Sequence, residues 1–314
     1  MNILSQTNHN VACWLEKVDP YYTQRIILRK GLYLAVWLTA FNWLAQPDVF
    51  NAYALSALLL APFYENPSLN TYKQKDLALV SAFVISGIGC VIFYLLYPFK
   101  FTLLFFSLAY LSGLFFFCDH FYPKFKPFIL QTIVFSALNM TIKPAASLQV
   151  ALDMFFCVML SLMVTFTGYK LHPNLYPKVW HRAFAHYLAA VSEEIGHAIN
   201  KFDTHNFIKG ASHLNALRAY RRLLPRKLLL NIMKTTVGIR NVQFAINHIY
   251  LKDKDEQFWY KFQKEIDAFR LAVIAKQEIA MPFVDANETE PTQAYVVKYL
   301  CRSIINWNKI CRKI

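Results

Sequence analysis

The sequence lacks the short motifs that mark most enzymes and nucleotide-driven pumps. It contains no glycine-rich phosphate loop, no serine nucleophile elbow and no zinc-protease helix. These absences argue against an enzyme and against an ATP-driven pump. We therefore expect no catalytic residue and no cofactor.

Cysteine pairs at metal-ligand spacing are also lacking. The chain has 6 cysteines, and no two of them form a Cys-x-x-Cys pair. Three lie in apolar runs, and three lie in parts expected to be cytoplasmic, where disulfides rarely persist. A disulfide framework and a metal-thiolate site are both disfavoured.

No stretch alternates between apolar and polar residues as a half-buried strand would. What the sequence has instead is a series of long apolar runs in its first half, each near the roughly 20 residues that a helix needs to cross a bilayer. They predict a membrane domain with six spans. The runs are Ile26–Gln46, Val49–Tyr64, Leu77–Tyr97, Phe99–Cys118, Pro127–Ile142 and Ala145–Tyr169.

Lysine and arginine in the loops predict the orientation of these spans. The leader and the second and fourth loops are the richer in Lys and Arg, and Lys170 opens the tail, whereas the alternate loops carry none or a single lysine. Because basic loops stay in the cytoplasm, we expect both termini inside and a multi-pass protein of a bacterial inner membrane. The first apolar run is too long for a signal-peptide core, so no segment is expected to be removed.

Composition changes after the sixth run. From Lys170 onward the chain has 23 Lys and Arg against 12 Asp and Glu, and its apolar residues recur at helical spacing. Helices are expected at Arg226–Tyr250, Asp255–Ala280 and Thr292–Cys311, after an earlier apolar stripe that includes Trp180 and Phe184. The predicted fold class is thus all-α, with residues 1–25 as a cytoplasmic N-terminal helical segment, 26–169 as a six-span transmembrane domain and 170–314 as a cytoplasmic helical domain.

A succession of residues in the first three runs resembles a known family. Arg29 opens the first run, Ala61-Pro62 and Asn66-Pro67 end the short second one, and Thr71-Tyr72-Lys73 leads into a third run that carries Gly87 and Gly89. This order is similar to the amino-terminal signature of the fusaric acid resistance and aromatic acid exporter family.

The resemblance implies a function as well as a fold. It implies an inner-membrane exporter of small organic anions, plausibly aromatic carboxylic acids, driven by the proton gradient. Because many family members carry the unit twice and this chain carries it once, it also implies a homo-oligomer, and a periplasmic adaptor is a further partner to consider. Two other readings stay open: a passive organic-anion channel, and a membrane scaffold or sensor whose helical tail binds partners.

Asp153 is the candidate for proton coupling. It is the one ionisable residue that stands well inside an apolar run, where a carboxylate costs on the order of 3 kcal/mol on insertion scales. Such a group faces a cavity or a partner and can hold a proton near neutral pH. The alternative is a protonated or hydrogen-bonded carboxyl near the outer membrane surface.

Six further residues are candidates for substrate binding. Arg29 and Lys30 stand where the first run enters the membrane and could receive a carboxylate, or could reach back to lipid headgroups. Short or broken middle helices often carry transporter sites, although a short span also arises from local bilayer thinning. The polar and helix-breaking candidates on the first, second and fifth runs are Asn42, Pro62, Gln131 and Asn139, of which the three amides could equally form hydrogen bonds between helices.

The tail offers two weaker signals. Glu194-Ile-Gly-His197 reproduces the Glu-x-x-His element of di-iron bundles, but such bundles need it twice, so we expect no metal site. A cluster of basic residues from Arg218 to Lys227 lies behind a membrane domain, which favours lipid headgroups, substrate attraction or a solvated face, and not nucleic acid.

Overall fold

The computed structural model describes residues 10–11, 14–46, 61–66, 68–123, 148–199, 207–249, 255–282 and 290–312, and every regular element in these ranges is a helix. The chain divides into two compact units. We call Gln24–Asn174 the apolar unit, and Met1–Thr23 together with Leu175–Ile314 the tail unit. The prediction of an all-α protein is confirmed over the described residues.

Four helices of the apolar unit match predicted runs: α2 (Thr23–Ala45), α5 (Tyr72–Leu96), α6 (Lys100–Phe121) and α8 (Leu148–Leu171). A fifth, α4 (Ala61–Tyr64), covers only the end of the second predicted run. The fifth predicted run, 127–142, and most of the second, 49–64, lie outside the described residues.

The described residues include two helices long and apolar enough to cross a membrane, α5 over Tyr72–Phe93 and α6 over Lys100–Phe121. A third qualifies only if part of α8 is counted together with the helix that follows it. These helices are compatible with a membrane location. The full set of six spans remains a proposal.

α5 begins with reciprocal side-chain caps. The backbone N–H of Gln74 donates to the Thr71 hydroxyl at 3.2 Å, and the Gln74 side chain accepts from the backbone N–H of Asn70 at 3.2 Å. The first bond satisfies an N–H group that the first turn of a helix leaves without a partner, and the second ties the segment before the helix to its first turn. The sequence Asn-Thr-Tyr-Lys-Gln therefore fixes where the helix starts.

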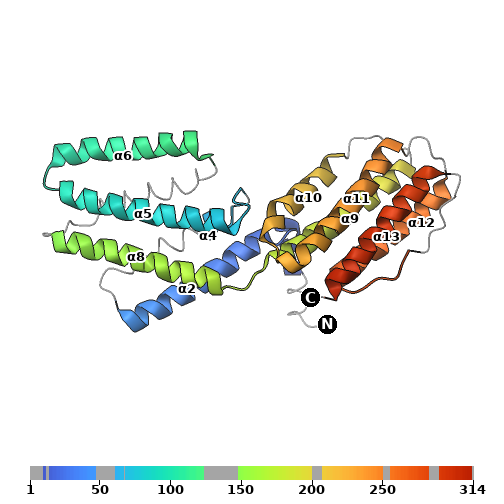
Figure 1. The fold of residues 1–314 in the computed structure, drawn as a ribbon, viewed down its shortest axis with the longest axis horizontal. Helices are drawn as coiled ribbons and strands as arrows, with labels where there is room; N and C mark the ends of the chain where they lie inside the picture. Colours follow the sequence, from blue (N-terminus) through green and yellow to red (C-terminus); the bar gives the residue numbers. More distant parts are fainter. Residues whose placement is uncertain are drawn as a thin grey trace. The chain divides into compact units, whose positions relative to one another are not determined.

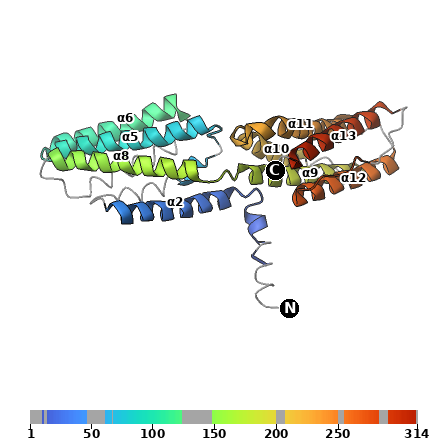
Figure 2. The same cartoon turned by 60° about the horizontal axis from the view of Figure 1, so that its bottom comes forward.

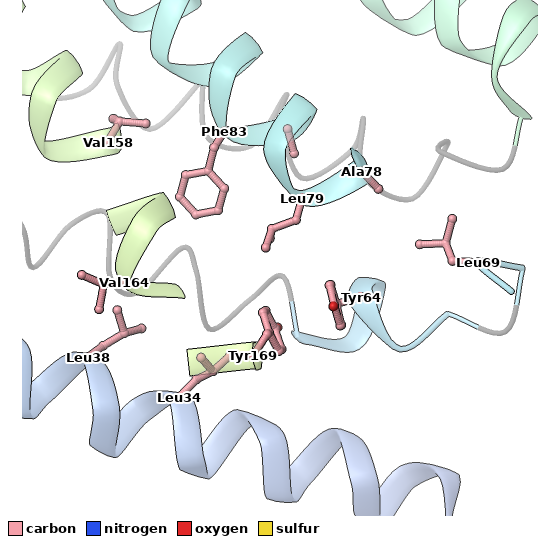
Figure 3. Close-up of a cluster of buried hydrophobic side chains, with 11 residues drawn as sticks. Leu34, Leu38, Tyr64, Leu69, Ala78, Leu79, Phe83, Val158, Val164 and Tyr169 are labelled. Carbon is pink, nitrogen blue, oxygen red and sulfur yellow. The ribbon is translucent and has the colours of Figure 1, made fainter. Parts of the chain in front are cut away.

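The core of the apolar unit lies between α2, α5 and α8, with α4 at one end (Figure 3). α2 contributes Leu34 and Leu38, α5 contributes Leu79 and Phe83, and α8 contributes Val164 among others. In Figure 1, α5 lies between α6 and α8. Large apolar side chains remain exposed along α6, which marks a surface for lipid or for protein.

The part of the tail unit after Leu175 has these helices among the described residues: α9 (Tyr176–Ile199), α10 (Phe207–Tyr220), η2 (Arg221–Leu223), which is a short 3-10 helix, α11 (Arg226–Ile249), α12 (Glu256–Ala275) and α13 (Pro291–Cys311). Residues 14–18 of its N-terminal part are helical as well. α9 packs against α10 and α12, and α11 packs against α13 (Figure 2). The stripe predicted from Trp180 and Phe184 is confirmed, because both side chains are buried in the core.

α12 ends earlier than the sequence predicts. The predicted helix extends to Ala280, but Lys276 adopts a left-handed conformation with φ of 57° and its N–H caps the carbonyls of Ala272 and Val273. Residues 277–282 then run without helical structure beside α13. The indole N–H of Trp307 donates to the Gln277 carbonyl at 2.9 Å, and Asn308 bonds both backbone groups of Ile279. Contacts distant in sequence therefore outweigh the helical preference of this segment.

The close approach of α11 and α13 yields a test. A Cβ atom at Gly238 would lie 2.1 Å from the Ser303 Oγ and 3.1 Å from the Tyr299 carbonyl oxygen. Gly238→Ala is expected to lower the free energy of unfolding by about 1–3 kcal/mol, the usual cost of overpacking. The measurement is thermal or denaturant unfolding of the purified chain.

The matched control removes the obstacle. Ser303 Oγ donates to the Tyr299 carbonyl at 2.8 Å, so it cannot turn away without losing that bond. Gly238→Ala combined with Ser303→Ala should cost less than the sum of the two single changes. Simple additivity would contradict the proposed clash.

Candidate functional site

Two lysines and one glutamate meet in the interior of the apolar unit. Lys30 Nζ lies 2.5 Å from Glu65 Oε1, and Lys75 Nζ lies 3.2 Å from Glu65 Oε2. The side chains of Lys30, Lys75 and Glu65 are 8%, 1% and 3% exposed. We call these residues the Lys30–Glu65–Lys75 cluster.

The cluster joins three segments of the chain. Lys30 stands on the buried stripe of α2, at four-residue spacing with Ile26 and Leu34. Lys75 lies in the first turns of α5, and Glu65 directly follows α4. The turn after Glu65 is held by Asn66, whose side-chain oxygen accepts from the Ser68 N–H at 3.0 Å and whose carbonyl accepts from Leu69. The sequence folds locally so that Glu65 faces both lysines.

Aromatic rings cover one side of the cluster. Lys30 Nζ and Lys75 Nζ lie 5.6 and 5.2 Å from the centroid of the Tyr64 ring, within the range of a cation–π interaction. The Tyr64 ring stacks on Tyr169 of α8 with centroids 4.0 Å apart, as Figure 3 shows. The rings shield the ammonium groups from water and leave the cations partly stabilised by π electrons.

A second ion pair adjoins the first at the surface. The Tyr64 hydroxyl donates to Asp76 Oδ1 at 3.1 Å, and Asp76 Oδ2 lies 2.5 Å from Lys170 Nζ. The Lys170 side chain is 45% exposed, so this pair is solvated where the cluster is not. Together with the cluster, this pair makes five charged groups. Three are ammonium groups and two are carboxylates, which leaves one formal positive charge in excess.

The arrangement can hold a carboxylate away from water. Burying ions costs several kcal/mol each, and only close pairing with further contacts offsets that cost. Lys30 and Lys75 supply such pairing from two helices to the single carboxylate of Glu65. A carboxylate of a ligand would meet the same two ammonium groups if the Glu65 side chain moved aside.

The structure places the predicted binding residues apart. Lys30 belongs to the cluster, whereas its neighbour Arg29 is exposed. Asn42 is half-buried towards the far end of α2, and Pro62 is exposed in α4. Gln131 and Asn139 lie outside the described residues.

Asp153 lies far from the cluster. It is exposed in the second turn of α8, sixteen residues before Tyr169, which corresponds to about 24 Å along a helix. Asp153 and Tyr169, whose ring stacks on the Tyr64 ring beside the buried ions, therefore stand at opposite ends of α8.

Glu65 was not identified as a site residue from the sequence. Lys75 was counted only among the basic residues of the second loop, which predict the orientation of the spans. A usable signal was present, because Lys30 interrupts the apolar stripe Ile26, Leu34, Leu38 and a buried cation needs an anion. The anion could not be chosen from spacing, since Glu65 is 35 residues away in the chain.

In the tail unit, Glu194 is engaged by an amide. Gln243 Nε2 donates to both Glu194 oxygens, at 2.8 and 3.0 Å, and Gln243 Oε1 accepts from the Tyr187 hydroxyl at 2.6 Å. His197 is exposed. Within the described ranges no three His, Cys, Asp or Glu side chains lie close enough to hold a metal ion. Burial raises the pKa of Glu194 to about 7. The hydrogen bond from Gln243 acts in the opposite direction, because it stabilises the carboxylate, but its effect is smaller.

The chain matches no protein-family model, and comparisons with curated proteins and with solved structures give no significant match.

The cluster predicts how the apolar unit responds to mutation. Glu65→Ala leaves two buried ammonium groups facing each other, so we expect a loss of about 3–5 kcal/mol in the free energy of unfolding. Lys170→Ala removes the solvated pair with Asp76 and should cost less than about 1 kcal/mol. Denaturant unfolding of both purified variants measures the two costs, and equal costs would show that the cluster is not buried as described.

Glu194 predicts a pH dependence. Because the folded protein holds this proton up to a pH of about 7 and the unfolded chain loses it near 4.5, the protein loses stability as pH rises through that window. Glu194→Gln still accepts from Gln243 and should be more stable than the parent at pH 8, by about 1–2 kcal/mol after allowance for solvent screening of a partly buried group.

The advantage should vanish at pH 4. Thermal unfolding of the two proteins across this pH range measures it, with Glu193→Gln on the exposed side of α9 as the control. A constant difference at all pH values would assign the effect to packing and not to the proton.

Proposed function

We propose that the chain is a transporter of small organic anions in a bacterial inner membrane, and that aromatic carboxylic acids are its plausible substrates. The observation that carries the proposal is the Lys30–Glu65–Lys75 cluster, in which two buried ammonium groups from different helices receive one carboxylate. The family resemblance of the first three apolar runs and the candidate spans of α5 and α6 support it.

The position of the cluster fits the entry of an anion from the cytoplasm. α2 and α5 begin at this end of the apolar unit, and α8 ends there. In the topology proposed from loop charge, these ends face the cytoplasm. An excess positive charge at a partly enclosed site attracts anions and raises their local concentration. Substrate would meet Lys30 and Lys75 first.

A passive organic-anion channel is the second candidate function. Proton-coupled export needs a titratable group that responds to substrate, and about 24 Å of α8 separates Asp153 from Tyr169, the residue of that helix whose ring adjoins the cluster. A channel needs no such group. Asp153→Asn separates the two: an exporter coupled through Asp153 loses the pH dependence of efflux, while a channel keeps its flux and its pH dependence unchanged.

The decisive experiment is transport by the purified chain in liposomes. With labelled benzoate as the probe, Lys30→Gln and Lys75→Gln should each lower the initial flux by at least tenfold, because each removes one of two charges that face the carboxylate. Lys170→Gln is the matched control, since it removes a lysine from the solvated pair, and it should change flux less than threefold.

Glu65→Gln tests the direction of the effect. It removes the carboxylate that occupies the two lysines and keeps the shape of the side chain, so benzoate should be transported with a lower KM. A cluster that only holds helices together predicts no such gain. Absence of flux in every variant and in the parent chain would favour a scaffold or sensor over a transporter.

A further inference from the structure

α11 and α13 share an unusual composition. Their 24 and 21 residues include no Asp or Glu, while the chain as a whole has 19. Seven cations stand on these two helices, and all of them are exposed: Arg226, Lys227, Lys234, Arg240, Lys298, Arg302 and Lys309. The two helices pack side by side, and Lys234, Arg302 and Lys309 meet on one face of the pair, which we call the cationic face.

A groove runs between the two helices on this face. Its volume is about 560 Å³, within the range of roughly 300 to 1,000 Å³ typical of small-molecule sites. Leu230, Met233 and Val237 of α11 and Tyr299 and Ile305 of α13 line it with apolar surface. Gly238 also lines the groove, where α13 approaches α11 closely.

Cations border the apolar floor. Lys234, Arg302 and Lys309 line the same groove, and the Arg302 guanidinium lies 5.7 Å from the centroid of the Tyr299 ring. A second, smaller hollow shares Met233 and Val237 with the groove and is bordered by Arg218, Arg221 and Arg240. An apolar strip along α11 is therefore flanked by cations on both sides.

We propose that this groove binds a small organic anion, a carboxylate on a flat aryl or short acyl body. The apolar floor accepts the body, and the cationic rim accepts the carboxylate. Charge complementarity selects the sign of the ligand, because neither helix contributes a carboxylate to the face. The volume of about 560 Å³ favours a small molecule as the occupant.

The test uses the full chain in nanodiscs of zwitterionic lipid, with 2-naphthoate as the probe and empty nanodiscs as the blank. Lys30→Gln, Glu65→Gln and Lys75→Gln are present in every sample, so that the buried cluster carries no charge and binding there does not contribute. We expect saturable binding with a Kd of about 0.1 to 1 mM, the affinity available to a ligand of this size.

Two variants separate the contribution of the groove's shape from that of its charge. Val237→Trp fills it without changing charge, and Arg302→Gln with Lys309→Gln removes two charges without filling it. Each should weaken binding at least tenfold. Lys261→Gln with Lys264→Gln makes the same charge change at exposed positions of α12, outside the groove, and should change Kd less than twofold.

Three results would overturn the proposal. Unchanged binding in Val237→Trp would show that the groove is not the site. An equal loss in the α12 control would reduce the effect to general electrostatics. Loss of naphthoate binding when one third of the nanodisc lipid is anionic would show that the face docks on a charged membrane instead. The test does not depend on transport by the apolar unit, because the background changes remove the lysines on which that proposal rests.

Discussion

Buried ion pairs connect three segments of the apolar unit. The ions involved are largely shielded from solvent, so each is stabilised by the opposite charge beside it. They are Lys30 on α2, Glu65 after α4 and Lys75 on α5. The hydrophobic packing of Leu34, Leu38 and Phe83 holds these segments close, but apolar packing tolerates small shifts in register. The ions tolerate such shifts less well, because a displaced carboxylate would no longer pair with both buried ammonium groups. The register of α2 against α5 is thus defined by polar contacts at one end and by apolar contacts along the length.

The tail unit follows a different rule. Its core is assembled from aromatic side chains such as Trp180, Phe184 and Trp307, which are almost fully buried. Two of its polar residues mark the ends of α12: Asp255 caps the start and Lys276 ends it. The cations of α11 and α13 lie at the surface, where solvent keeps their mutual repulsion small. The chain therefore buries Lys30 and Lys75 in one unit and exposes the cations of α11 and α13 in the other.

The local sequence pattern was sufficient to predict most helices, but it was insufficient to predict the residues of the candidate site. α11 and α13 start and end within a residue of their predicted bounds, because periodicity, Pro225 and Pro291 are all local signals. The end of α12 was wrong by five residues, since Trp307 and Asn308 hold the following segment and lie about 30 residues away. The same limit applies to Glu65, whose importance arises from lysines on two other helices. Asp153 drew attention because its neighbours in sequence are apolar, yet its side chain is exposed in the described structure.

The tail unit combines segments from both ends of the chain, and this limits when during synthesis it can fold. Tyr21 is hydrogen-bonded to His213 across 192 residues, and Arg182 lies 3.9 Å from Glu16. The ribosome thus synthesises one part of this unit before the whole apolar unit and the other part after it. Residues 1–23 have none of these partners while Gln24–Asn174 leaves the ribosome, so the tail unit cannot complete its core until the whole apolar unit has been translated.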